Sequence, residues 1–193
     1  MEDFILYLKL GLYHVLDWQA YDHIVFLIAL AVIYSFSNWK KVIWLVTLFT
    51  IGHTLTLTLA AYKVVNINVN IVEFLIPLTI FITALVNILT IKKSKQKSSN
   101  INLIFALFFG LIHGLGFSNY FRMLIDDSEA KLLPLLEFAL GIEIAQVIIV
   151  LTILTVGYVI QYFLRVSKRD WVLVMSSIVI GIVIPMLTER IFW

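Results

Sequence analysis

The sequence predicts an all-α membrane protein, a polytopic bundle of six transmembrane helices plus an N-terminal interfacial or re-entrant helix. Hydrophobic residues make up 62% of the chain, and the mean hydropathy is +1.02. Apolar runs of about 20 residues recur along the chain, and each is long enough to cross a hydrocarbon layer of roughly 30 Å. We therefore expect residues 1–193 to form a single integral membrane domain with the lipid bilayer around it.

The expected spans cover about residues 22–37, 41–62, 69–91, 102–122, 132–164 and 171–190. The apolar segment 3–16 is interrupted by Lys9 and is too short to span comfortably, so we expect an amphipathic or re-entrant helix on the outer face. The polar, basic stretch 92–101 is expected to be a flexible cytoplasmic linker. This linker divides the chain into two three-helix halves, residues 1–91 and 102–193.

Basic residues gather in every second connection between the expected spans, and acidic residues gather on the other side. By the positive-inside rule, both termini lie outside the cytoplasm, and the protein is expected in the inner (cytoplasmic) membrane. The net charge of +2 is scattered over short loops, so no nucleic-acid partner is expected. The basic residues are Lys40, Lys41, Lys92, Lys93, Lys95, Lys97, Arg165, Lys168 and Arg169, and the acidic ones include Asp126, Asp127 and Glu129.

Ionisable side chains inside the apolar runs are the main functional signal. They are costly in a membrane, so by default they face a polar interior and mark a functional site. The chain holds four histidines and no cysteine, and imidazoles combined with carboxylates suit divalent metals such as nickel, zinc or cobalt. The candidates inside the apolar runs are His53, His113, Glu73, Glu137 and Glu143.

A first polar cluster lies just before and at the start of the first expected span. His14 and Asp17 are three residues apart, so they are neighbours on a helix. Asp22 and His23 then open the span at its outer boundary. The simpler alternative is that Asp22 caps that helix and His23 is an ordinary interfacial histidine.

Glu73 and Pro77 form a second outer feature, in the third expected span. Pro77 has no N–H, so it frees the carbonyl four residues earlier, which belongs to Glu73 itself. Glu73 therefore offers a carboxylate and an unpaired backbone oxygen, which suits a cation. A kinked helix with a hydrated glutamate explains the same pattern.

His53 and His113 are expected near the membrane midplane. Gly114 and Gly116 follow His113, and glycines are unfavourable in an ordinary helix interior. In a membrane they permit close backbone approach or local unwinding where protein or water covers the backbone. Packing alone, with an interhelical hydrogen bond to each histidine, remains the alternative.

The fifth expected span carries two further carboxylates. Glu143 and Gln146 are three residues apart, which places two oxygen-bearing groups on one helix face near mid-membrane. Glu137 lies further out, where it is suited to be an entry carboxylate.

Taken together, these motifs resemble the HupE/UreJ family over about residues 11–192. Members of that family are regarded as hydrogenase and urease accessory proteins, which implies a secondary permease for nickel. By this resemblance, His14, Asp22 and His23 match the family's N-terminal histidine and Asp-His motif, and His113 matches its His-Gly motif. The matching segments are Tyr21-Asp22-His23, Thr50-Ile-Gly52-His53-Thr54, Val72-Glu73-Phe74, Gly110-Leu-Ile-His113-Gly114-Leu-Gly116-Phe117 and Gly141-Ile-Glu143-Ile-Ala-Gln146.

The function expected from the sequence is therefore that of a permease for a divalent transition metal, nickel first, with zinc or cobalt as alternatives. It would have two sites in series, and a gradient or a separate partner would drive it, because no nucleotide-binding motif is present. A homo-oligomer or a metal-delivery partner is left open. The expected outer capture site is Asp17, Asp22, His23 and Glu73, and the expected midplane site is His53, His113 and Glu143.

Two other functions use the same residues. An intramembrane zinc-dependent hydrolase would activate water on the metal, with Glu143 or Asp22 as the base. A haem-b membrane anchor would use His53 and His113 as axial ligands on two different helices. The spread of histidines from the membrane edge to mid-depth favours the permease.

Overall fold

The computed structural model describes residues 2–17, 21–91, 99–118, 121, 123 and 131–192. Over these residues the protein is all helical and has no strand, which confirms the predicted class. Most of the basic linker and the acidic residues 126–129 lie outside the described part. The helices are α1 (Glu2–Leu16), α2 (Asp22–Ala31), the 3-10 helix η1 (Phe36–Asn38), α3 (Trp39–Ala61), α4 (Val69–Thr90), α5 (Ser99–Gly116), α7 (Leu132–Phe163) and α8 (Lys168–Glu189).

Four segments among the described residues are long and apolar enough to cross a membrane: Phe36–Ala61, Val69–Thr90, Leu132–Phe163 and Lys168–Glu189. The protein is therefore a helical membrane protein. α5 has 18 residues, and the expected helix over 102–122 already ends at Gly116. The expected helix over 22–37 is wrong in length, because α2 has only 10 residues and rises about 15 Å.

The early end of α2 has a local cause. Ser35 has an extended backbone, with φ −90° and ψ 160°, and it is followed by the short helix η1. A residue with an extended backbone cannot continue the helical hydrogen-bond pattern. The chain therefore turns at Ser35 instead of extending the helix to residue 37.

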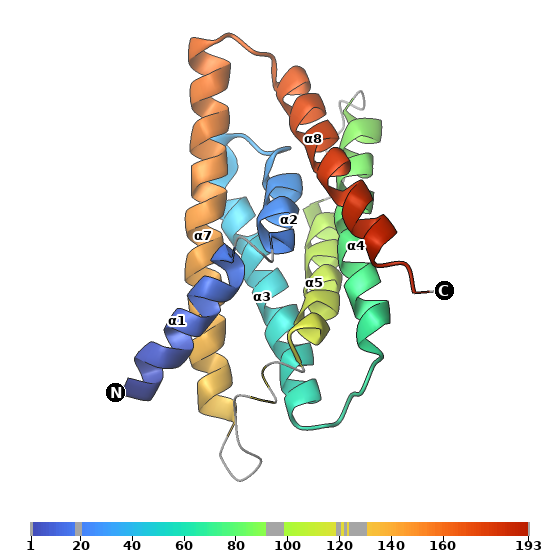
Figure 1. The fold of residues 1–193 in the computed structure, drawn as a ribbon. Coiled ribbons are helices and arrows are strands. Elements are labelled where there is room, and N and C mark those ends of the chain that lie inside the picture. The colour runs from blue at the N-terminus through green and yellow to red at the C-terminus, as the bar shows by residue number, and fades with distance from the viewer. Residues whose placement is uncertain are drawn as a thin grey trace.

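α1 and α2 follow one another like one helix that is interrupted between Leu16 and Asp22. Figure 1 shows α1 rising obliquely beside the long helix α7 and ending where α2 begins. The backbones of α1 and α7 touch at Gly11 and Gly141: a Cβ on Gly11 would fall on the Phe138 carbonyl, and one on Gly141 would fall on the Leu8 carbonyl. The C-terminal half of α1 is thus packed closely against α7.

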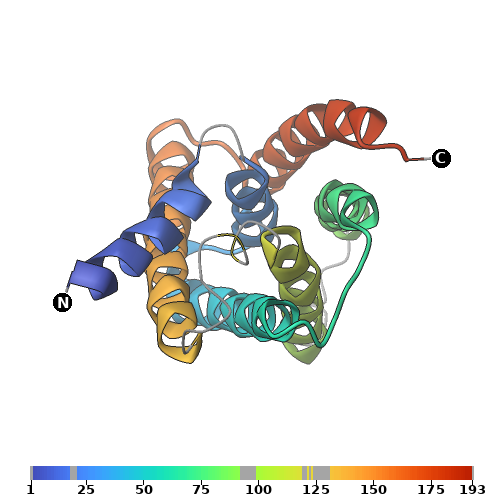
Figure 2. The same ribbon diagram turned by 60° about the horizontal axis from the view of Figure 1, so that its bottom comes forward.

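The short helix α2 lies in the middle of the bundle. In Figure 2, with the bottom of the molecule turned forward, α3, α4, α5, α7 and α8 surround it. All of its residues except Ile24 and Ile28 are buried. The N-terminal end of α2 therefore places whatever side chains it carries inside the protein, about halfway along the neighbouring helices (Figure 1).

Candidate metal centre

The four histidines come together at the junction of α1 and α2. The ring centroids of His14 and His23 are 4.6 Å apart, and those of His23 and His113 are 5.5 Å apart. The His53 centroid lies 5.7 Å from that of His14 and 6.0 Å from that of His23. His23 is therefore the centre of a cluster that draws one histidine from each of α1, α2, α3 and α5.

Three of these histidines have the spacing of a metal site. One ring nitrogen from each of His14, His23 and His53 can be chosen so that all three lie within 4.8 Å of one another. Nitrogen ligands of a first-row metal lie about 2.1 Å from the ion, so tetrahedral partners are about 3.4 Å apart. Small side-chain rotations would close the triad around a metal, and His113 lies on the other side of His23.

The imidazoles have buried nitrogens with no hydrogen-bond partner among the described residues. Leaving such atoms without a partner in a low-dielectric interior costs free energy, and each instance calls for an explanation. A bound cation would take the lone pairs of several of these nitrogens at once. The atoms without a partner are His14 Nε2, His23 Nε2, His53 Nδ1, His53 Nε2 and His113 Nε2.

Two of the histidines are held in the tautomer that a metal needs. The Nδ1 of His23 is 2.9 Å from Asp22 Oδ1, and the Nδ1 of His113 is 2.9 Å from the Phe109 carbonyl oxygen. A carboxylate and a carbonyl only accept, so each Nδ1 carries the hydrogen and each Nε2 keeps its lone pair. This is how outer partners orient metal-binding histidines.

Asp22 therefore does more than the helix capping that its position suggested. The N-cap residue of α2 is Tyr21, which makes no side-chain capping bond. Asp22 Oδ1 accepts the backbone N–H of His23 at 2.8 Å as well as its ring N–H. The carboxylate fixes His23 through two hydrogen bonds.

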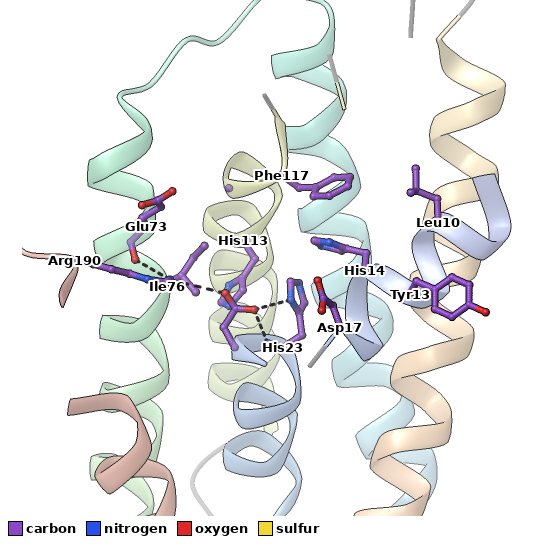
Figure 3. Close-up of a pocket in the computed structure, with 12 residues that line it drawn as sticks. Leu10, Tyr13, His14, Asp17, His23, Glu73, Ile76, His113, Phe117 and Arg190 are labelled. Carbon is purple, nitrogen blue, oxygen red and sulfur yellow. Dashed lines mark hydrogen bonds and ion pairs between the residues drawn. The ribbon is translucent and has the colours of Figure 1, made fainter. Parts of the chain in front are cut away.

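Three of the four histidines, His14, His23 and His113, line a cavity of about 590 Å³, drawn in Figure 3. Its wall carries the carboxylates of Asp17, Asp22 and Glu73 and the guanidinium of Arg190. Among the described lining residues, three are acidic and one is basic, and this excess of acidic groups suits a cation. The remaining lining residues are Leu10, Tyr13, His14, His23, Ile76, His113, Gly116 and Phe117.

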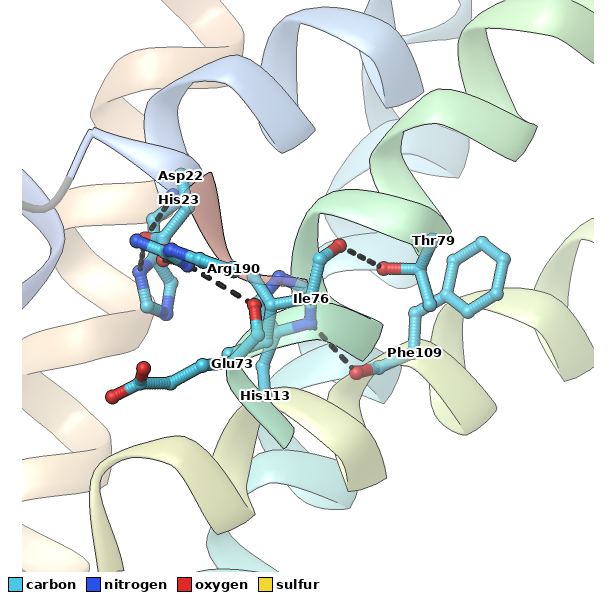
Figure 4. A network of polar contacts seen from close by, with 8 residues as sticks. All are labelled: Asp22, His23, Glu73, Ile76, Thr79, Phe109, His113 and Arg190. Carbon is cyan, nitrogen blue, oxygen red and sulfur yellow. Dashed lines mark hydrogen bonds and ion pairs between the residues drawn. The ribbon is translucent and has the colours of Figure 1, made fainter. Parts of the chain in front are cut away.

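The sequence analysis did not identify Arg190 as a site residue. Its Nη1 donates to the Glu73 carbonyl at 3.3 Å and lies 4.0 Å from Asp22 Oδ2, as Figure 4 shows. Pro77 frees that carbonyl, as its position in α4 predicted, but the cation bound there is a side chain from the end of α8. The signal available in the sequence was a charged residue directly after an apolar span.

Glycines bring α3 and α5 close enough for His53 and His113 to face the same centre. A Cβ on Gly114 would fall on the His53 carbonyl, so the two backbones are in contact. Thr56 fixes the pair by donating its hydroxyl hydrogen to the Leu111 carbonyl at 2.8 Å. Gly116, two residues further along α5, lines the cavity opposite Ile76.

Glu143 is not brought into the histidine cluster. Its carboxylate accepts hydroxyl hydrogens from Thr47 at 2.6 Å and from Thr50 at 2.5 Å, between α3 and α7. Gln146 is fully buried beside Thr50, and Glu137 is buried on α7 and does not line the cavity. The expected division is thus changed, because His53 joins His14 and His23 instead of pairing with Glu143.

Comparison with known proteins supports the same family that the motifs suggested. A family profile described as "HupE / UreJ protein" matches residues 1–189. No curated protein and no solved structure matched the chain. The match covers every α-helix of the described residues and all four histidines, so this chain belongs to the HupE/UreJ family.

Proposed function

We propose that this protein is a permease for a divalent transition metal, which enters from the outer face and is bound by His14, His23 and His53. The observation that carries the proposal is the set of buried imidazole nitrogens without partners around one cavity. Imidazole and carboxylate ligands without thiolates suit nickel, and they also suit zinc and cobalt. His113 would take the ion next, as it leaves the triad.

The interrupted first segment supports transport. Secondary transporters commonly bind substrate near mid-membrane at the break of a discontinuous helix. Here the break between α1 and α2 carries His14 at one end and His23 at the other. Counting α1 and α2 as one crossing gives six crossings with both termini outside the cytoplasm, consistent with the charge distribution in the loops.

The charge of the cavity supports a cationic substrate. Asp17 and Glu73 are exposed side chains in its wall, so they attract an incoming cation from solvent. Asp22 is buried next to His23 and acts at short range. An ion would thus meet carboxylates first and the imidazoles after it loses water.

An intramembrane zinc hydrolase is the second candidate, because catalytic zinc sites use three protein ligands and an open position. The triad beside a wide cavity meets that description, with Asp22 as the nearest carboxylate. A haem between His53 and His113 is not supported. The contact of Gly114 with the His53 backbone leaves no room for a porphyrin between α3 and α5.

Purified protein in proteoliposomes tests the proposal. We expect uptake of nickel into the vesicles, and the His23→Ala variant should lose at least about tenfold in metal affinity and in uptake at low metal. Thr152→Ala is the matched control, since Thr152 is exposed on α7 and bonds only within its own helix. Metal binding without any flux would favour the hydrolase, and unchanged affinity in His23→Ala would overturn both.

A further inference from the structure

A second polar site lies between α3 and α7, one to two turns of α3 from His53. Thr50 is near the middle of α3, about 17 Å from either end of the helix. Glu143 on α7 receives the hydroxyls of Thr47 and Thr50 on its two carboxylate oxygens. A carboxylate at this depth is expensive, so it requires a functional explanation.

The available hydrogens do not decide between a charged and a neutral Glu143. The Thr47 hydroxyl has two acceptors in range, Glu143 Oε1 at 2.6 Å and the Ile43 carbonyl at 3.0 Å. The Thr50 hydroxyl has three, Glu143 Oε2 at 2.5 Å, Gln146 Oε1 at 3.1 Å and the Val46 carbonyl at 3.1 Å. Each hydroxyl has a single hydrogen to give.

Both protonation states of Glu143 can therefore be fully bonded. In the ionised state, both hydroxyl hydrogens point to the carboxylate. In the neutral state, the proton on Oε2 points to the Thr50 oxygen, and the Thr50 hydrogen turns to Val46 or Gln146. Only hydrogens rotate between the two arrangements, so neither state leaves Glu143 unsatisfied.

Gln146 supplies an independent sign of a changing partner. It is fully buried, its Oε1 lies 3.1 Å from the Thr50 hydroxyl, and no group among the described residues accepts a hydrogen bond from its Nε2. An unpaired amide N–H group in this interior is costly. The site is thus incompletely satisfied in the arrangement seen.

No ion pair to Glu143 is found among the described residues. Its bonding partners are two hydroxyls, which leaves a proton as the charge that it can exchange. Among the residues whose side chains the structure describes, the charged groups and histidines on the helices packed against α7 are Lys9 and His14 on α1, Asp22 and His23 on α2, Lys40, Lys41 and His53 on α3, and Lys168, Arg169, Asp170 and Glu189 on α8.

We propose that Glu143 is a proton-binding site that exchanges one proton against the metal, so that metal movement is coupled to proton movement. This inference rests on the proposed transport function and names its coupling ion. When the dication binds to His14, His23 and His53, the O–H bond of the Glu143 carboxyl group breaks, which leaves a carboxylate and releases one proton. When the metal leaves, the carboxylate takes a proton back.

The arrangement gives the exchange a physical reason. Moving a doubly charged ion through the low-dielectric interior is strongly unfavourable without compensating charge. A carboxylate formed near His53 lowers that cost when the metal is present, and its neutral form lowers the cost when the metal is absent. The same residue would thereby favour alternate loading of metal and proton.

Infrared difference spectroscopy on the purified protein tests this without requiring transport. Nickel addition to the wild-type protein should remove the carbonyl stretching band of a protonated carboxyl group. The band should be missing from Glu143→Gln and retained in Glu189→Gln, a matched change at an exposed site. In parallel, protons released per metal bound should fall by about one in Glu143→Gln, while metal affinity changes less than about tenfold.

The outcomes separate this proposal from the transport function. A larger loss of affinity in Glu143→Gln would make Glu143 a metal ligand and overturn proton exchange, as would an unchanged proton release. A wild-type protein that binds no metal would overturn the proposed function. In that case a reversible carboxyl band on pH titration, absent from Glu143→Gln, would still support a proton site, and its absence would overturn one.

Discussion

Replacing Asp22 by asparagine keeps the shape of the site and removes one buried negative charge. An ion on His23 Nε2 lies about 7 Å from Asp22, given a metal–nitrogen distance of about 2.1 Å, the width of the ring and the 2.9 Å hydrogen bond. At an effective dielectric constant of about 20, a dication and a carboxylate at this separation attract by about 5 kcal/mol. Removing a carboxylate partner of a metal-bound histidine typically costs about 10–100-fold in affinity.

Arg190 determines how large the loss of metal affinity in Asp22→Asn is within the range of about 10–100-fold. Its guanidinium, 4.0 Å from Asp22 Oδ2, offsets part of the carboxylate's attraction in the wild-type protein. In Asp22→Asn this positive charge loses the carboxylate beside it and repels the metal more strongly than the pair did. We therefore expect a loss near hundredfold for Asp22→Asn, and a smaller one, near tenfold, when Arg190→Gln is added.

Competition between the purified protein and a chromogenic chelator measures these affinities directly, at constant pH and at low and high salt. Because Asp22 is buried and bonded to His23, the loss of metal affinity in Asp22→Asn should persist at high salt, where long-range attraction is screened. An affinity within about twofold of wild type would refute the assigned role of Asp22. If adding Arg190→Gln does not restore any of the affinity lost in Asp22→Asn, the role of Arg190 is refuted.

Three further results are expected. Replacing His14 or His53 by alanine should each lower affinity at least about tenfold and the double change little more, since the ligands act as one unit; small additive losses would make them packing residues. Gly114→Val should impair folding or metal binding, because its side chain would overlap the His53 carbonyl, and normal binding would contradict the contact. In this cysteine-free chain, a single cysteine at Val64 should label from outside intact cells and one at Ser167 should not; the reverse would invert the orientation.

The overall class of the fold was predictable because it depends on local composition. The hydrophobic runs identified the helices α3, α4, α7 and α8, whose length and hydropathy are intrinsic to each segment. The end of α2 at Ala31 was not predicted, although Ser35 and Asn38 supplied a local signal. The position of the junction between α1 and α2 inside the bundle, where His14 and His23 lie, was therefore not predicted, because hydrophobic runs were assigned as spans by their length alone.

Which histidines meet depends on contacts that are distant in sequence. Depth along each helix suggested that His53 pairs with His113 and that His14 stays at the surface. The close packing of α1 on α7 through Gly11 and Gly141 brings His14 inward to His23. A glycine can be recognised in the sequence, but the helix it will touch cannot.

The Glu73 carbonyl oxygen, which Pro77 leaves without a helical partner, also shows what the sequence can and cannot predict. Proline chemistry predicted an unpaired Glu73 carbonyl, and that oxygen does receive a bond from outside its helix. The donor is Arg190, 117 residues away in sequence, so its identity follows only from the crossing of α8 over α4. The sequence predicted that the Glu73 carbonyl is a free acceptor suited to a cation, but it did not predict which group would bind there.

The break between α1 and α2 also explains why a cation is favoured at this place. The last carbonyls of α1 have no partner within the helix, so this end carries partial negative charge next to His14. The start of α2 carries partial positive charge, which would repel a metal, but Asp22 in its first turn offsets that charge. An unbroken helix would have satisfied both ends internally, so the interruption provides the electrostatic preference that the three imidazoles then make specific.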